Sequence, residues 1–219
     1  MIKSLLHFND PNDLTKDEVK GVYWEVFGTV DSSQDGKFGN CLSISHIFSS
    51  DGYLYLNNKK NKIDLSFDKE WTLDMWVYQE FLQDQTFFQM SPAIYAYDGN
   101  LNIKLSSMSY WKKSLNLPLN SWFHFALVNK SQTLYAFVNG VKQVERTNQD
   151  IYRSPYTIET RLGSSENTGY GFVGLIDEVR ISDEALWTSD FTPPVTEYHL
   201  DKYKFIYIDK NNTVMGMRN

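Results

Sequence analysis

Apolar residues recur along this chain in short alternating runs, separated by clusters of Gly, Asn, Asp and Ser. A period of two predicts β-strands, because successive side chains of a strand point to opposite faces. The run at residues 71–78 (WTLDMWVY) has large side chains on both faces, so we expect this strand in the middle of a layered structure. Its faces carry Trp71, Leu73, Met75 and Val77 on one side, and Thr72, Asp74, Trp76 and Tyr78 on the other.

The clearest hairpin signal lies at residues 134–142 (LYAFVNGVK). Asn139-Gly140 stands between two apolar runs and suits a two-residue turn in which both central residues have positive φ. The run at residues 122–128 (WFHFALV) is apolar on both faces except for His124, which we interpret as a satisfied core residue. Further strands are predicted at residues 4–8, 41–44, 53–56, 86–90, 101–106 and 172–182.

Helical periodicity is nearly absent from the sequence. The one helix-like piece is residues 183–187 (DEALW), where Ser182 or Asp183 could cap a single turn. Parallel strands need crossover connections of roughly a dozen residues, usually helices, and such segments are missing. The pattern therefore predicts an all-β fold.

Composition and charge exclude several classes of protein. The formal net charge is −6 and the 21 Lys and Arg residues are scattered, which argues against a nucleic-acid partner. Cys41 is the single cysteine, so neither an intrachain disulfide nor a multi-cysteine zinc site can form. The start, MIKSLLHFNDPND, lacks the apolar stretch of a signal peptide, and no run approaches the roughly 20 apolar residues of a membrane helix. We expect a soluble chain without membrane insertion and without an export signal.

Five segments resemble a known family. Residues 35–42 (DGKFGNCL) resemble the G-K-F-G-x-A-L segment of laminin-G-like and concanavalin A-like lectin/glucanase domains, with Cys41 in place of the alanine. The runs WTLDMWVY and WFHFALV resemble two strands of that family, and LYAFVNGVK is similar to its hairpin. The closing stretch at residues 171–194 (GFVGLIDEVRISDEALWTSDFTPP) is similar to a version found especially in bacteriophage and prophage proteins.

The resemblance implies a concanavalin A-like, two-sheet antiparallel jelly-roll sandwich over residues 1–194. Residues 195–219 are then a C-terminal extension, in which YKFIYID and TVMGM flank an Asn-rich turn and predict a hairpin or assembly tail. Such a hairpin could add to the sandwich edge, dock on a neighbouring subunit or lead into a following domain.

Catalysis is not supported by the sequence. Glycosidases need two carboxylates on opposite sides of the scissile bond, and glucanases of this fold carry an E-x-D-x-E type pattern that is absent here. Asp177 and Glu178 are adjacent, so we expect them to point to opposite faces of a strand. No nucleophile motif, metalloprotease motif or phosphate loop is present. We predict that the chain is not an enzyme.

Asp177 is the most informative acid in the sequence. We expect it to share an inward face with Leu175, Val179 and Ile181, where an ionised carboxylate must be paired, hydrogen-bonded or bound to a cation. The family resemblance implies a structural calcium at Asp177, completed by Asn9 or Asp10. The alternative is that Asp177 pairs with an arginine or accepts bonds from nearby backbone amides. The neighbouring Glu178 and Arg180 are expected to face the other way, in a salt bridge and in contact with solvent.

Two aromatic segments are candidates for ligand binding. Sugar sites combine aromatic faces with groups that bond hydroxyls, and residues 91–100 (SPAIYAYDGN) and 107–116 (SMSYWKKSLN) have that character. The alternative is that these are ordinary strand residues of a tyrosine-rich β-protein. The candidate ligand-binding residues are Tyr95, Tyr97, Asp98, Tyr110 and Trp111.

These observations favour recognition over chemistry. We expect a module that binds carbohydrate or another host-surface component as part of a phage virion or tail. It would be made in the host cytoplasm, carried out with the particle and extracellular when it functions. The second hypothesis is a decoration or assembly protein that binds other virion proteins, and the third is a glycosidase. Resemblance to phage appendages implies a homo-oligomer, usually a trimer.

Overall fold

The structure is a computed structural model of the 219-residue chain. It describes residues 1–48, 50–57, 61, 63, 65, 68–80, 85–90, 94–97, 100–104, 110–114, 117–147, 160–164, 170–200, 206–208 and 214–217. The elements in these ranges are all strands, which confirms the all-β prediction. A search of the same ranges finds no helix that is long and apolar enough to cross a membrane.

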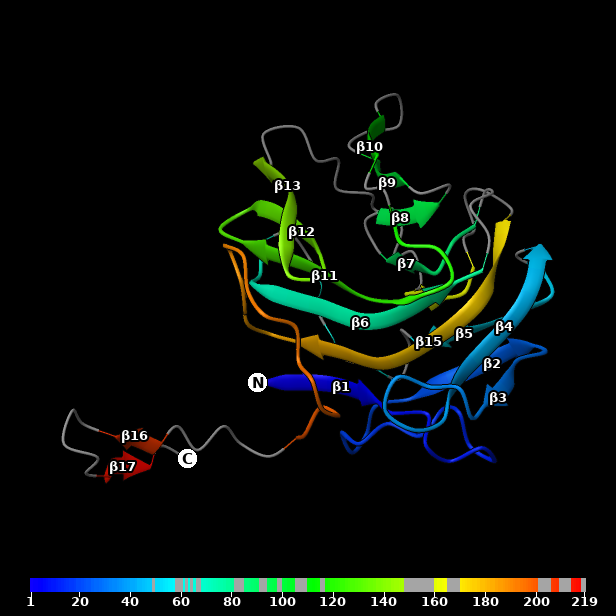
Figure 1. The fold of residues 1–219 in the computed structure, drawn as a ribbon, viewed down its shortest axis with the longest axis horizontal. Coiled ribbons are helices and arrows are strands. Elements are labelled where there is room, and N and C mark those ends of the chain that lie inside the picture. Colours follow the sequence, from blue (N-terminus) through cyan, green and yellow to red (C-terminus); the bar gives the residue numbers. More distant parts are fainter. Residues whose placement is uncertain are drawn as a thin grey trace.

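Two antiparallel sheets stack face to face (Figure 1). The eight-stranded sheet lies nearer the viewer in Figure 1, and β1 (Ile2–Leu6) joins it by pairing with the C-terminal half of β15. Its other strands, in spatial order, are β13 (Val141–Thr147), β12 (Thr133–Val138), β11 (Trp122–Lys130), β6 (Trp71–Gln79), β15 (Tyr170–Ser182), β4 (Cys41–Phe48) and β3 (Asp31–Ser33).

The seven-stranded sheet lies behind the first. Its strands, in spatial order, are β10 (Tyr110–Ser114), β9 (Asn100–Lys104), β8 (Ile94–Tyr97), β7 (Phe88–Met90), β14 (Arg161–Leu162), β5 (Gly52–Leu56) and β2 (Trp24–Gly28). Near the C-terminus, β16 (Ile206–Ile208) and β17 (Val214–Met217) pair as a two-stranded sheet of their own. The two large antiparallel sheets confirm the expected jelly-roll sandwich.

Alternation along β6 matches the sequence prediction. Trp71, Leu73, Met75 and Val77 are fully buried in the main hydrophobic cluster between the sheets. Phe88 and Met90 of β7 face them from the second sheet, also fully buried. The opposite positions of β6, which include Asp74, Trp76 and Tyr78, therefore belong to the outer face of the eight-stranded sheet.

The predicted hairpin turn is confirmed by its backbone angles. Asn139 has φ 50° and Gly140 has φ 76°, the positive values that a two-residue turn of this kind requires. A Cβ at position 140 would also lie 1.9 Å from the carbonyl oxygen of Phe191. Glycine therefore lets residues after β15 approach the turn, where Phe191 N donates to the Gly140 carbonyl over 2.9 Å.

Residues 183–200, which we call the strap, correct the prediction of a helical turn at residues 183–187. No helical turn forms there. Instead the hydroxyl of Thr72 on β6 donates to the Glu184 carbonyl over 2.7 Å and accepts from Leu186 N over 3.0 Å. The sheet thus satisfies the backbone groups that a helix would have paired internally, and the strap runs extended across the outer face (orange, Figure 1).

A β-bulge in β15 corrects the predicted faces of its charged residues. Asp177 is opposite Trp76 and Arg180 is opposite Asp74, so three steps along β15 match two steps along β6. Glu178 absorbs the extra residue with a φ of 53°. As a result Asp177 and Arg180 both lie on the outer face, whereas Val179 and Ile181 point into the core, and Glu178 and Arg180 are buried rather than solvent-exposed.

Candidate functional site

The outer face of the eight-stranded sheet holds a buried ion pair beneath the strap. Arg180 is 4% exposed and Asp74 is 0% exposed. The guanidinium binds the carboxylate with two bonds, from Nε to Oδ1 over 2.9 Å and from the terminal nitrogen to Oδ2 over 2.8 Å. Burial alone would raise the pKa of Asp74, but the Arg180 charge and the His124 bond outweigh it and hold that pKa below its usual value.

The strap closes over this pair with aromatic side chains. The His124 Nε2 atom lies 3.1 Å from Asp74 Oδ2 and 2.9 Å from the Tyr198 hydroxyl. The Tyr198 ring also lies 4.1 Å from the guanidinium carbon of Arg180. Trp187 and Phe191 stack on one another at 3.8 Å between ring centroids, and both have an edge contact with His124. The prediction that His124 is buried is confirmed, but it lies under the strap and not between the sheets, and its Nδ1 atom has no hydrogen-bond partner in the structure, so it is not fully satisfied.

Asp177 and Glu178 form a second group of buried polar side chains, which we call the polar corner, where β15 meets β1. Asp177 is 1% exposed and accepts from the backbone N–H groups of Phe38, over 3.1 Å, and Glu178, over 2.8 Å. Glu178 accepts from His7 over 2.5 Å and from Tyr198 N over 2.6 Å. Bonding to backbone amides is one of the two alternatives expected for Asp177, while the arginine in this region pairs with Asp74 instead.

The expected calcium partners, Asn9 and Asp10, are hydrogen-bonded to other groups. Asn9 Oδ1 accepts from Asn40 N, and Asp10 Oδ1 accepts from Asn12 N. Within the described ranges, no group of three or more His, Cys, Asp and Glu side chains gathers to hold a metal ion. Calcium takes six to eight oxygen ligands, so side chains here supply few of them and backbone carbonyls would have to supply the rest. Calcium at Asp177 and Asp10 stays a prediction.

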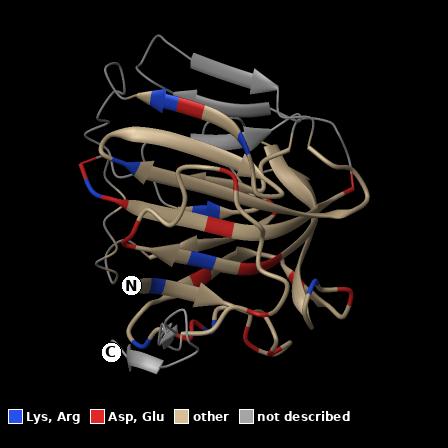
Figure 2. Ribbon diagram, turned by 60° about the vertical axis from the view of Figure 1, so that its left-hand side comes forward, with Lys and Arg blue, Asp and Glu red and all other residues tan. Residues whose placement is uncertain are grey.

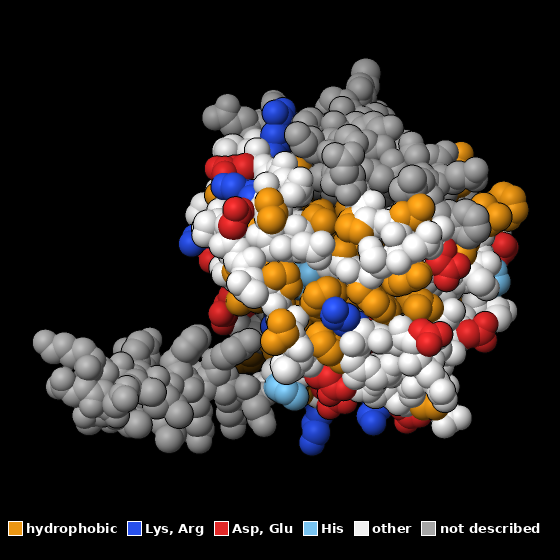
Figure 3. All heavy atoms as spheres, viewed as in Figure 1, with side chains coloured by type: hydrophobic (Ala, Val, Ile, Leu, Met, Phe, Trp, Pro, Cys, Tyr) orange, Lys and Arg blue, Asp and Glu red, His pale blue; other side chains and the backbone are white. Residues whose placement is uncertain are grey.

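Four aromatic side chains form what we call the shelf: Phe38, Trp76, Tyr78 and Trp122. Tyr78 and Trp122 are directly opposite each other on β6 and β11, with ring centroids 5.8 Å apart. Phe38 meets the edge of Trp76 at 5.9 Å. Phe38, Tyr78 and Trp122 are each partly exposed, so the strap covers one part of the outer face and leaves the shelf accessible. Figure 3 shows apolar side chains gathered on this face over β6 and β15.

Lys37 completes the shelf as its positive group. The ammonium lies 4.2 Å from the centroid of the Trp76 ring and 5.7 Å from that of Phe38. The Trp76 indole N–H is buried and has no hydrogen-bond partner in the structure. An indole N–H in such a position usually finds an acceptor, so the shelf contains a buried donor that is unsatisfied in the structure.

The sequence of this sandwich matches a known protein family. A family model described as the concanavalin A-like lectin/glucanases superfamily (Laminin_G_3) matches residues 48–190. The chain belongs to this family. No match was found among curated proteins. The family assignment accounts for a lectin-like sandwich and leaves the ligand of this concanavalin A-like domain open.

Solved structures show the same fold at low sequence identity. Domain 4 of AbnA, a GH43 extracellular arabinanase from Geobacillus stearothermophilus solved with arabinotriose, is 21% identical with a TM-score of 0.66, covering 85% of this chain and 94% of that one. A structure of botulinum neurotoxin type C, whose cell entry depends on two ganglioside molecules, is 13% identical with a TM-score of 0.64. The binding domain of botulinum neurotoxin DC with rat synaptotagmin II is 13% identical with a TM-score of 0.66.

The extent of these matches differs. Each covers 85% of this concanavalin A-like domain, but the domain spans only 48% and 49% of the two neurotoxin chains. The three similar proteins bind an arabinose oligosaccharide, gangliosides and a protein receptor according to their descriptions. At these identities the likeness shows the fold alone.

The sequence-predicted ligand residues fall on the seven-stranded sheet. Tyr95 and Tyr97 belong to β8, and Tyr110 and Trp111 belong to β10. For these four the structure describes only the backbone, and Asp98 lies outside the described residues. The sheet order brings β8 and β10 to either side of β9, at the end of the sheet.

Strand register separates Trp111 from Tyr95. Trp111 is opposite Ile103, which is opposite Ile94, and Ile94 is opposite Met90 of the core. Trp111 therefore stands in the same register row as Met90 of β7. Tyr95 belongs to the neighbouring row, opposite Asn102 and Gln89. These residues stay predictions as binding groups.

The shelf is the part of the site that sequence reasoning missed. Trp76, Tyr78 and Trp122 were recognised as strand residues, and Phe38 as part of a family motif. The usable signal was the pair of large aromatic residues on the second face of β6, which a sandwich strand would ordinarily leave polar. Pairing of Tyr78 with Trp122 depends on the antiparallel register of β6 and β11, which the sequence pattern does not give.

The polar corner predicts that stability falls as the pH rises. Burial raises the pKa of Asp177 from 3.8 to about 7. For His7, burial lowers the pKa, but the Glu178 bond and charge outweigh it and raise that pKa above 6.5. In both cases the folded state binds the proton more tightly, so the stabilisation is lost between about pH 4 and pH 7 for Asp177 and above 6.5 for His7.

Urea midpoints measured in chelator should therefore decline across this range, and Asp177→Asn should remove the lower part of the decline. An unchanged pH profile for that variant would contradict the assignment.

Proposed function

We propose that this chain is a non-catalytic recognition module that binds carbohydrate, or another host-surface component, as part of a phage virion or tail. The shelf carries the proposal. Sugar rings pack their apolar faces on aromatic side chains, and Tyr78, Trp122 and Phe38 offer such surfaces on an open part of a rigid sheet.

The polar groups of the shelf suit the same ligand. Lys37 is held over Trp76 by a cation–π contact, which is worth only about 0.5–1 kcal/mol at an exposed site. A ligand that displaces this side chain would gain the Trp76 ring and an indole N–H that has no acceptor. A sugar hydroxyl or ring oxygen supplies the acceptor, so the ligand satisfies a donor that the free protein leaves unpaired.

Carboxylates on this face are arranged for structure and not for hydrolysis. Asp74 is held by Arg180, and Asp177 and Glu178 are 1% exposed and bonded to backbone amides. A glycosidase needs one carboxylate free to donate a proton and a second free to attack or to activate water. These three acids meet neither requirement in the described part of the face, which supports binding over catalysis.

The phage setting is supported by the closing sequence GFVGLIDEVRISDEALWTSDFTPP, which resembles phage and prophage proteins. In that setting the chain would be made in the host cytoplasm and become extracellular with the virion. Lys and Arg positions are dispersed along the ribbon in Figure 2 and alternate with Asp and Glu, in keeping with a partner other than nucleic acid.

An assembly or decoration protein of the virion is the second candidate. It is favoured by exposed apolar side chains on the seven-stranded sheet and the β4 end, where Val26, Phe27, Ile47 and Phe48 are 43–62% exposed. Apolar surface of this kind on a soluble protein marks an interface with another protein. Recognition and assembly use different surfaces here and are compatible.

A glycan array of the purified chain, run with calcium and again with chelator, tests the function. Binding to one glycan family, lost in Tyr78→Ala but kept in Tyr95→Ala, would place the site on the shelf. The reverse result would move it to the seven-stranded sheet.

Loss of binding in chelator, or a calcium-dependent rise in Tm that Asp177→Asn abolishes, is expected if the predicted calcium is bound. An array without any binding would leave assembly as the function.

A further inference from the structure

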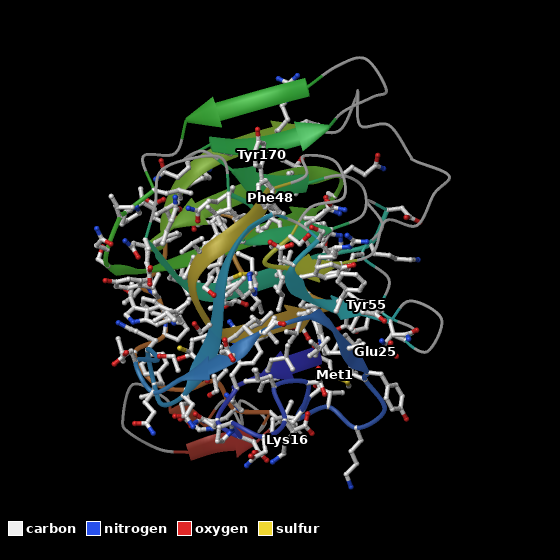
Figure 4. All side chains as sticks on the ribbon, turned by 90° about the vertical axis from the view of Figure 1, so that its right-hand side faces the viewer. Met1, Lys16, Glu25, Phe48, Tyr55 and Tyr170 are labelled. Atoms are coloured by element: carbon white, nitrogen blue, oxygen red, sulfur yellow. The ribbon has the colours of Figure 1, made fainter. Side chains whose placement is uncertain are left out.

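A patch of exposed apolar side chains lies where β2 ends beside the β4–β5 turn. Val26 and Phe27 of β2 are 43% and 47% exposed, and Ile47 and Phe48 of β4 are 62% and 61% exposed. Backbone bonds hold these segments together, from Thr29 N to the Asp51 carbonyl over 2.9 Å and from Asp51 N to the Phe48 carbonyl over 3.2 Å. Figure 4 faces this side of the molecule, with Phe48 beside Tyr170 at the strand ends.

β2 is an edge strand whose one charged residue is Glu25. It lies at the end of the seven-stranded sheet and pairs with β5 alone among the described strands. Its sequence, WEVFG, contains no Lys and no Pro, and its register with β5 runs without a bulge. Proteins usually blunt a free edge with such features, because an open edge binds other strands. Val26 and Phe27 are therefore placed where an added strand would cover them.

The C-terminal hairpin consists of two strands that pair with no larger sheet among the described strands. β16 and β17 pair only with each other among the described strands. An isolated two-stranded hairpin is marginally stable in water, and the segments FIYI and VMGM are apolar, so this hairpin needs a further sheet to pack on. Adding it to an existing edge would extend that sheet by main-chain hydrogen bonds.

Charge also favours contact between the C-terminal hairpin and the β2 edge. Residues 201–219 (DKYKFIYIDKNNTVMGMRN) contain four Lys or Arg and two Asp, although the whole chain has a net charge of −6. Among the described side chains near the patch, Glu25, Asp31 and Asp51 are acidic and Asp31 and Asp51 are exposed, while Arg161 lies over Tyr53, which stacks on Phe27. The exposed acids at the end of β2 would attract a basic hairpin.

We propose that the β16–β17 hairpin of one copy of the chain adds to the β2 edge of a second copy. The strap ends on the outer face of the eight-stranded sheet, where Tyr198 is buried, whereas β2 belongs to the other sheet. The segment from Leu200 to β16 extends at most about 21 Å, so the hairpin stays near the end of its own strap unless it meets a second copy. Because the contact between copies joins two different surfaces, it builds a closed ring or a chain.

Light scattering coupled to size exclusion tests the proposal on the full chain. We expect the wild type to form an oligomer with a mass that is a multiple of 25.6 kDa. The edge variant Val26→Lys/Phe27→Lys and the hairpin variant Ile206→Pro/Ile208→Pro should each be monomeric. Val141→Lys is the matched control, because Val141 is 52% exposed on β13, an edge strand of the other sheet, and it should stay oligomeric.

Mixing the two monomeric variants distinguishes exchange from other contacts. The edge variant keeps a hairpin and the hairpin variant keeps an edge, so the mixture should form one-to-one dimers that neither variant forms alone. A monomeric wild type, or a mixture that stays monomeric, would overturn the proposal. So would self-association of the hairpin variant, which would show that β2 edges pair with each other. Circular dichroism of each variant checks that the sandwich is folded.

Discussion

Replacing Arg180 with methionine is expected to lower the free energy of unfolding by about 3–5 kcal/mol, because the Asp74 carboxylate then stays buried without its counter-charge. Asp74 is 0% exposed and accepts two bonds from Arg180, of 2.9 and 2.8 Å. The Tyr198 hydroxyl is uncharged and cannot replace a full positive charge. Equilibrium unfolding in urea at pH 7 measures the loss.

Two further variants separate the charge from the packing. Arg180→Met combined with Asp74→Leu removes both charges, and it should recover most of the stability because the pair's desolvation penalty is removed with it. Lys142→Met breaks the exposed pair between Lys142 and Glu145 and should leave the unfolding free energy nearly unchanged, because water screens exposed pairs. A loss below about 1 kcal/mol for Arg180→Met alone would contradict the importance of the buried pair.

The acid limb of the stability curve gives an independent check on the same pair. The pKa of Asp74 is held below 3.8 in the folded state, so its stabilisation is present above that value and is lost as the pH falls through the lower folded pKa. The wild type should therefore lose more stability than the Arg180→Met/Asp74→Leu variant when the pH is lowered from about 4 to about 2.

The sequence pattern correctly predicted the features that depend on residues close together in the chain. The β6 alternation follows from apolar residues at every second position, and the turn at Asn139-Gly140 follows from two residues that accept positive φ. Both signals are complete within a few residues of sequence. The family motifs added the order of the strands but not their register.

Long-range contacts decided the parts that were predicted wrongly. The sequence around Asp177 reads as a regular strand, yet Glu178 has a φ of 53°, and its carboxylate is bonded to His7 and to the backbone of Tyr198. That single extra residue moves Arg180 onto the face of Asp74. In the same way, Thr72 on β6 holds the backbone at residues 184–186 and prevents the expected helical turn. Neither partner is near in sequence.

The shelf depends on both local pattern and long-range contacts. Its rings come from three separate segments, and its open area depends on where the strap ends. Tyr198 packs near Trp76 in a small cluster that also contains Leu5, with Phe38 and Trp122 partly buried against it. The strap thus forms one border of the shelf, and the Tyr78–Trp122 pair is its accessible part. A ligand on the shelf would contact rings that the sheet already holds in place, so little side-chain entropy is lost on binding.

Trp122→Ala should therefore weaken binding of the recognised glycan by at least about 30-fold, since a central aromatic contact of an interface is worth about 2 kcal/mol or more. Isothermal titration with the best ligand from the array measures the change, and thermal melts confirm that the variant is folded. Tyr135→Ala is the matched control, because Tyr135 lies on the outer side of β12 beside the strap residues and not on the shelf, and its affinity should stay within about threefold of the wild type. Lys37→Ala should bind neutral glycans more tightly, because the Trp76 ring is then uncovered, or more weakly if the ligand is acidic and uses the ammonium. Equal affinities for the wild type and Trp122→Ala would show that the glycan is bound elsewhere, and the tyrosine-bearing strands β8 and β10 would then be the next surface to test.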